Sequence, residues 1–189
     1  MNVLPTPTPY TVITDTREQR NYNFFCPLEI EDNEGETDWD GYDFVASLPG
    51  KTKRETFTIR TQVGTLATGE YSIAGFEDRM AVERKAVADL FGTLGKGRER
   101  FVRELERLSA MEFAAVVVEA EWSTIITTPP QRSKLHPRSI VGSVIAWQVR
   151  YPKIHWAFLP GRDFAEAYTA RLLDKWWREH QPINRPAAP

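Results

Sequence analysis

Glu83 and Lys85 lie two positions apart in a stretch of strand-forming residues, 80–85, and their types could do chemistry. Side chains alternate along a β-strand, so both would project to one face while Arg84 projects to the other. Hydrolysis of a phosphodiester needs a cation to neutralise charge at phosphorus and a positive group to hold the nucleophile or stabilise the transition state. A carboxylate beside an ammonium suits that reaction, although on spacing alone such a pair is usually only a surface ion pair worth under ~1 kcal/mol.

Two further acids could complete a metal site with Glu83. Asp15 follows the strand-like stretch 10–14, and Glu70 lies in the sequence Gly-Glu-Tyr at 69–71, where another strand-like stretch begins. Magnesium prefers oxygen ligands and retains several of its waters, so two or three carboxylates are enough to bind it. The candidate metal ligands are therefore Asp15, Glu70 and Glu83.

Hydrophobic periodicity predicts the elements that must position these acids. Strands are expected at 10–14, 56–61, 71–73, 80–85, 113–118 and 154–159, and helices at 86–94, 98–108, 139–150 and from Asp163 to Trp176. Strands 71–73 and 80–85 should form a hairpin, and the apolar run 113–118 is typical of a strand buried on both faces. Strands that first follow one another and then alternate with helices predict an α/β fold, with a central mixed sheet in an α/β/α arrangement.

Three of these elements carry finer expectations. Strand 56–61 alternates in the way typical of an antiparallel strand. In helix 98–108 the face that mixes arginines with glutamates is expected to be solvated, opposite a buried stripe of Phe101, Leu105 and Leu108. In helix 139–150 the residues expected to point inward are Ile140, Val141, Val144 and Ile145.

The formal net charge of −2 hides an uneven distribution along the chain. Residues 29–43 contain eight acids and no Lys or Arg, which leaves the rest of the chain at +6. No acid occurs from Trp122 to Arg162, a stretch that carries six Lys and Arg residues. Such a basic stretch could contact phosphates or could simply form a solvated face, and charge alone does not decide between the two.

The length of 189 residues fits one domain of ordinary size. We expect a flexible leader at 1–9, a single domain at 10–181 and a flexible tail at 182–189, with an acidic and polar insertion at 29–55 that forms a surface loop. Cys26 is the single cysteine, and no apolar run approaches the roughly 20 residues that span a bilayer. These features favour a cytoplasmic protein with no membrane association.

Several separated motifs occur in a specific order, namely Asp15-Thr-Arg-Glu18, Gly69-Glu-Tyr71, Val82-Glu-Arg-Lys85, Asp89-Leu-Phe-Gly-Thr-Leu94 and Gly97-Arg98. Their order and spacing resemble the nuclease domain of the XPF family of structure-specific endonucleases, the ERCC4 type. The resemblance runs from about Val12 into the last helices, interrupted by the insertion. One motif departs from the family pattern, because the family usually has Asp in Gly-Asp-Tyr and this chain has Glu70.

This resemblance implies a restriction-endonuclease-like core and Mg²⁺- or Mn²⁺-dependent cleavage of DNA at branches, flaps or junctions. It implies that Asp15, Glu70 and Glu83 are metal-site acids and that Lys85 positions or activates the water. Arg84 and Asp89 would complete the catalytic group, with Arg17 and Glu18 beside it. Asp89 has a competing role, because an acid near the start of a helix can act as a cap or a dipole partner.

Partners and alternatives also follow from the resemblance. It implies a small stand-alone nuclease like those of phages and prophages, acting in recombination, repair or packaging as a homodimer. Residues expected to contact DNA are Arg17, Lys96, Arg98, Arg132, Lys134 and Arg138. The glycine-rich stretch 92–97 lacks the features of a nucleotide-binding loop, so no nucleotide cofactor is expected. The alternatives are an inactive DNA-binding or scaffold subunit and a restriction-type or junction-resolving nuclease.

Overall fold

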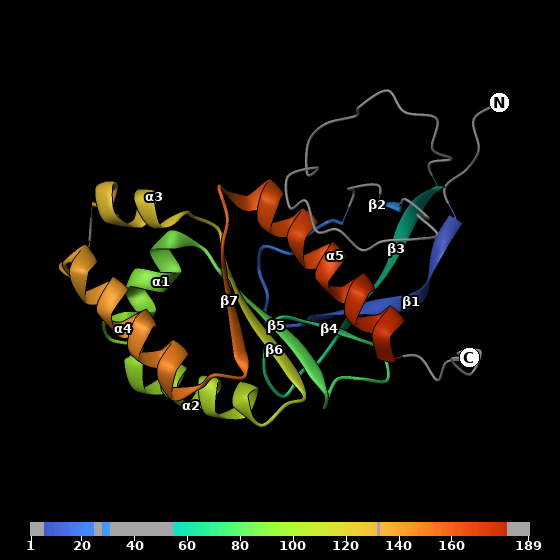
Figure 1. Cartoon of the computed structure of the whole chain (residues 1–189), viewed down its shortest axis with the longest axis horizontal. Coiled ribbons are helices and arrows are strands. Elements are labelled where there is room, and N and C mark those ends of the chain that lie inside the picture. Colours follow the sequence, from blue (N-terminus) through green and yellow to red (C-terminus); the bar gives the residue numbers. More distant parts are fainter. Residues whose placement is uncertain (1–5, 25–27, 31–54, 132, 181–189) are drawn as a thin grey trace, which may run out of the picture.

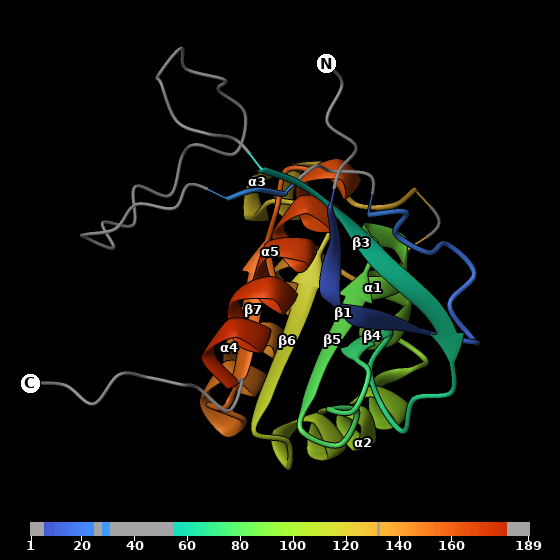
Figure 2. The same cartoon turned by 90° about the vertical axis from the view of Figure 1, so that its right-hand side faces the viewer.

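A seven-stranded mixed sheet forms the centre of the protein in the computed structural model, which describes residues 6–24, 28–30, 55–131 and 133–180 (Figures 1 and 2). The strand order is β2-β3-β1-β4-β5-β6-β7. The strands are β1 Thr6–Asp15, β2 Leu28–Ile30, β3 Glu55–Gly64, β4 Tyr71–Ile73, β5 Met80–Lys85, β6 Phe113–Val118 and β7 Ile154–Phe158. The helices are α1 Val87–Leu94, α2 Arg98–Ser109, α3 Trp122–Thr127, α4 Pro137–Arg150 and α5 Arg162–His180.

The strand directions make the sheet mixed, as predicted. Strands β5, β6 and β7 run parallel to one another, and β4 pairs antiparallel with both β1 and β5. The predicted hairpin is therefore confirmed, with Tyr71 opposite Val82. The antiparallel assignment of β3 was incomplete, because β3 pairs antiparallel only with the short β2 and runs parallel to β1. Alternation reports which residues share a face and carries no information on the direction of the neighbouring strand.

Helices cover both faces of the sheet, which gives the predicted α/β/α layers. One core cluster packs α1, α2 and α4 against the face of β5 and β6 that carries Ala81, Val116 and Val118. The other packs α5 against the opposite face, through Val82 and Val117. Figure 1 shows α5 on one side of the strands and the other four helices on the opposite side. The run at β6 is almost wholly buried, as expected for a strand covered twice.

Some boundaries and faces differ from the predictions. Strand β1 begins at Thr6, so residues 6–9 belong to the sheet and not to a leader. Strand β4 pairs only with residues 12–14 of β1, so the edge of residues 6–9 that would face β4 is unpaired by it and tolerates Pro7 and Pro9. Helix α3 was not predicted. In α4 the buried stripe is Ile140, Val144 and Trp147, whose ring packs against Phe101 and Trp156, and Ile145 is 52% exposed.

Several expectations fall outside the described residues. These are the leader at 1–5, the tail from 181, Cys26, Arg132 and the acidic insertion between 31 and 54. The ends of the insertion are seen as β2 and the start of β3, which pair at the edge of the sheet away from β5. Among the helices of the described part of the chain, none is long and apolar enough to cross a membrane.

Candidate active site

Three segments that carry predicted site residues meet where β1 and β5 end. The backbone N–H of Asp15 donates to the carbonyl of Glu70 at 2.9 Å, and the N–H of Glu70 donates to the carbonyl of Val82 at 2.9 Å. Gly69 makes this approach possible, since its φ is +77° and a Cβ at this position would lie 2.9 Å from the Cβ of Ala81. The Gly-Glu-Tyr motif is therefore a close-packed bridge between the two strands.

The face of β5 that is covered by α2 holds Glu83 and Lys85, both buried. The ammonium of Lys85 forms an ion pair with Glu83, and its Nζ lies 4.0 Å from Oε2 of Glu104 on α2 and 4.8 Å from the centre of the Phe101 ring. Burial raises the pKa of Glu83 to about 7, against the opposing effect of Lys85 and with a further contribution from the nearby Glu104. Two carboxylates thus share one lysine.

Glu70 and Glu18 form a second carboxyl pair beside the first. Burial, followed by the charge of Glu83 and the contact with Glu18, raises the pKa of Glu70 to about 10. Burial opposes ionisation of Glu18 as well, but the hydrogen bond with Glu70 and the proximity of Arg84 leave its pKa below the ordinary value. Glu70 is therefore the protonated member, which donates to Glu18, and its own Oε2 accepts from the N–H of Arg84 at 3.2 Å.

Asp15 is buried, but its carboxylate is already fully bonded. It accepts from Nε and Nη2 of Arg17 at 2.6 and 2.9 Å, from the N–H of Arg17 at 2.8 Å and from the N–H of Leu66 at 2.7 Å. Burial works to raise the pKa of Asp15, but these hydrogen bonds outweigh it and the pKa is lowered. Metal ligation by Asp15 would require Arg17 to release it. Consistent with this, the part of the chain that the structure describes holds no group of three acids already arranged around a metal position.

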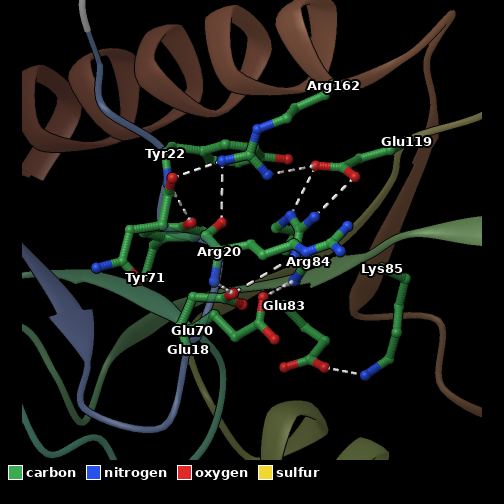
Figure 3. Close-up of polar contacts among 11 residues, drawn as sticks. Glu18, Arg20, Tyr22, Glu70, Tyr71, Glu83, Arg84, Lys85, Glu119 and Arg162 are labelled. Atoms are coloured by element: carbon green, nitrogen blue, oxygen red, sulfur yellow. Dashed lines mark hydrogen bonds and ion pairs between the residues drawn. The ribbon is translucent and has the colours of Figure 1, made fainter. Parts of the chain in front are cut away.

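The opposite face of β5 carries Arg84, which is bound by acids rather than by solvent (Figure 3). Its Nε and Nη2 donate to the two oxygens of Glu119 at 2.6 and 2.8 Å, and its Nη1 lies 3.5 Å from Oε1 of Glu18. Burial alone would lower the pKa of Arg84, but the hydrogen bonds and charge of Glu119 raise it instead. Glu119 also lies 3.4 Å from Nη1 of Arg162, the first residue of α5.

Other predicted residues lie apart from this cluster. Asp89 is exposed in the first turn of α1, and no hydrogen bond or ion pair among the described residues links it to the acids, so its position fits the helix-dipole role. The cations expected to contact DNA are exposed where the structure describes them, namely Arg17, Lys96, Arg98, Lys134 and Arg138. Arg98 donates to the hydroxyl of Ser143 at 2.8 Å and lies over the Trp147 ring.

Sequence reasoning missed Glu104, Glu119 and Arg162. Glu104 was assigned to a solvated face, although it follows Phe101 by three positions and so borders the buried stripe of α2. Glu119 comes directly after a buried strand, the same signal that singled out Asp15, and its N–H donates to the carbonyl of Lys85 at 2.9 Å. Arg162 was counted only as part of a basic stretch, because its partners are far away in sequence.

The mixed sheet, its two helical layers and the acid–lysine cluster at the strand ends define a restriction-endonuclease-like domain. The sequence matches the ERCC4 domain over residues 15–172. The chain therefore belongs to the ERCC4 domain family of DNA nucleases, which confirms the resemblance seen in its motifs.

A solved structure agrees on the fold. XPF from Aeropyrum pernix matches with a TM-score of 0.56 and 18% sequence identity, and the match covers 90% of this chain and 66% of that chain. XPF from Aeropyrum pernix in complex with DNA matches with a TM-score of 0.46 and 20% identity over 67% of this chain and 57% of that chain. This chain thus spans about two thirds or less of the chains it matches. A search of curated proteins found no significant match.

Proposed function

We propose that this domain is a metal-dependent endonuclease that hydrolyses phosphodiester bonds in branched, flap or junction DNA. The observation that carries the proposal is the crowding of Glu70, Glu83 and Glu104 around the single ammonium of Lys85. Buried carboxylates that outnumber their cations are destabilised unless a further positive charge joins them. Family membership supplies the substrate class, because the ERCC4 domain family acts on DNA.

The donor set fits Mg²⁺ or Mn²⁺. All candidate ligands are carboxylate oxygens, and burial together with the charge of a neighbouring carboxylate raises the pKa of Glu70 and of Glu83. Glu70 and Glu83 would hold the ion, with Asp15 once it is free of Arg17. A bound divalent ion would lower the pKa of a water molecule and neutralise charge at phosphorus.

Lys85 would stabilise negative charge that develops during cleavage. Burial acts to lower its pKa, but Glu83 and Glu104 outweigh that effect and raise it, so the side chain carries its charge at neutral pH. The contact with Glu83 and the nearby carboxylate of Glu104 hold the ammonium at the end of β5, beside Glu70. A fixed charge in a water-poor site stabilises a transition state more than the same charge in water does.

The setting of the enzyme is part of the same proposal. We expect a cytoplasmic nuclease of recombination, repair or phage DNA metabolism, which works as a homodimer on branched DNA. Exposed cations, among them Lys96, Arg98, Lys134 and Arg138, would bind the phosphate backbone through sequence-independent contacts.

The test is cleavage of end-labelled flap, fork, four-way junction and plain duplex DNA, each with Mg²⁺, Mn²⁺ or a chelator. Purified protein and Glu83→Ala are compared, with Glu106→Ala, on the exposed face of α2, as the control. The proposal expects metal-dependent cutting of a branched substrate that is lost only in Glu83→Ala. Preference for plain duplex would indicate a restriction-type nuclease. DNA binding without cleavage in either metal would indicate an inactive binding subunit.

A further inference from the structure

The segment between β1 and residue 24 has no regular secondary structure, yet it carries Glu18 into the candidate active site. Such a segment needs tertiary contacts to hold its backbone in one place. Arg162 supplies two of them, since its Nη2 donates to the carbonyl of Arg20 at 3.0 Å and to that of Asn21 at 2.5 Å. The guanidinium also lies over the Tyr22 ring, 5.0 Å from its centre.

The same guanidinium is connected to the site through Glu119. Nη1 of Arg162 lies 3.4 Å from Oε1 of Glu119. The carboxylate of Glu119 in turn accepts two hydrogen bonds from Arg84, one at each oxygen. Arg84 then reaches Glu18, so positive and negative charges alternate along Arg162, Glu119, Arg84 and Glu18 (Figure 3). Three of these four side chains are at most 8% exposed. Each charge is thus paired with an opposite one within the cluster.

Tyr22 gives the segment a further fixed point. Its N–H donates to the hydroxyl of Tyr71 at 2.8 Å, and the two rings stack with centres 5.0 Å apart. Tyr71 directly follows Glu70, so the segment is tied to the same bridge that carries this acid. Together with the hydrogen bonds from Arg162, this contact fixes the backbone at residues 20–22, which follow Glu18 in the chain, whereas Asp15 precedes it.

We propose that Arg162 and Glu119 are positioning residues that clasp residues 16–24 onto the sheet and so hold Glu18 against Glu70 and Arg84. This inference rests on the proposed nuclease function, and it gives Arg162 a role other than binding phosphate. Neither residue touches the reacting atoms in this scheme. They act by keeping the acid pair Glu18 and Glu70 in one geometry, and small displacements of such groups can slow a reaction by about 10²-fold.

The first experiment compares wild type with Arg162→Ala and with Arg79→Ala as the control. Arg79 is 42% exposed against 35% for Arg162, and its ion pair with Glu112 lies at the other end of β5. Hydrogen exchange without DNA should become faster in residues 16–24 only in Arg162→Ala. The single-turnover rate should fall about 10-fold while the Kd for DNA changes less than about 2-fold. Unchanged exchange, or a weaker Kd with an unchanged rate, would overturn the proposal.

Two further variants keep the test decisive. In a Glu18→Gln background, Arg162→Ala should slow cleavage by less than about 2-fold, because a positioning residue has little left to position; full additivity would contradict it. If Arg162→Ala fails to fold, Arg162→Lys keeps the charge but loses the planar fork, and should show intermediate exchange and an intermediate rate. If wild type cleaves no DNA, the proposed function fails, while the exchange measurement still decides whether the clasp exists.

Discussion

The charged clusters on the two faces of strand β5 both contain acidic and basic side chains, but the balance of positive and negative charge differs between them. On the α2 face, Glu83 and Glu104 share Lys85, and the charge of Arg17, which also acts on them, is already paired with Asp15. On the α5 face, Arg84 and Arg162 alternate with Glu119 and Glu18, and acids and bases are equal in number. The first face is short of positive charge, whereas the second is neutral as a group.

This difference separates a group that can react from a group that holds it in place. Charge that is already balanced offers little to an incoming ion, whereas buried acids in excess favour a cation or a proton. Burial is the main cause of the raised pKa of Glu83 and of Glu70, and the charge of a neighbouring carboxylate adds to it in both, which places the excess of acids on the α2 side and at the bridge. The α5 side should therefore contribute mainly stability and geometry. The following predictions break or sharpen this contrast.

Removing Lys85, the cation paired with Glu83 on the α2 face, should have the largest effect. Lys85→Ala should lower the single-turnover cleavage rate by about 10³-fold or more, because the charge proposed to stabilise the transition state is lost. Lys175→Ala, an exposed lysine of α5, is the control and should cleave at the wild-type rate. A residual rate within about 10-fold of wild type would exclude Lys85 from the chemistry.

Unbalancing the α5 face should instead reduce stability. Glu119→Gln leaves the buried guanidinium of Arg84 without its main acid, and the free energy of unfolding should fall by about 3 kcal/mol. Glu112→Gln breaks the exposed pair with Arg79 and should cost less than about 1 kcal/mol. Urea unfolding measures both. Equal losses in the two variants would contradict the distinction between the faces.

Glu104→Gln tests whether the missed acid of α2 belongs to the site. The single-turnover rate should fall about 10-fold, because Lys85 loses one of the two carboxylates that orient it. Glu106→Gln changes the same residue type on the exposed face of the same helix and is the matched control. If both variants cleave equally fast, Glu104 only solvates the helix, as the sequence first indicated.

Glu70 should make the stability of the metal-free protein depend on pH. Its pKa is raised from 4.5 to about 10 in the folded protein, so between these values the folded state keeps a proton that the unfolded chain has lost, and stability falls as pH rises. The contribution is at most about 1.4 kcal/mol between pH 6 and pH 7. In chelator, Glu70→Gln should therefore gain in Tm over wild type as pH increases. Parallel pH curves for the two proteins would contradict this.

Local patterns in the sequence predicted most of the fold and one face of the site. The alternation in Met80–Lys85 separated Glu83 and Lys85 from Arg84, and helical spacing located α1 and α2. The same patterns assigned Glu104 to solvent, because a face of mixed charges looks alike whether it meets water or a buried lysine.

What could not be predicted depends on contacts between distant segments. The clasp joins Arg162 to Arg20 and Asn21 across about 140 positions, as the 141- and 142-residue separations show, and no local pattern encodes that pairing. The direction of β3 depends on its neighbour β1, and the buried face of α4 includes Trp147, which packs on Phe101 and Trp156 from other elements. The motifs that indicated the family contain the acids of the site but not Glu119 and Arg162, the residues proposed to support them.

The parallel pairing of β5 with β6 also restricts which single-codon deletions the domain can tolerate. Residues 83–85 lie opposite Val116, Val117 and Val118, and side chains alternate between the faces at every step. Deleting one codon of β5 ahead of residue 83 would move Arg84 to the α2 face and Glu83 to the α5 face, so both would leave their present partners in a single event. Between β2 and β3, at the far edge of the sheet, a change in length shifts no site residue between faces. Codon-by-codon deletion scanning should therefore find β5 intolerant and the β2–β3 connection permissive.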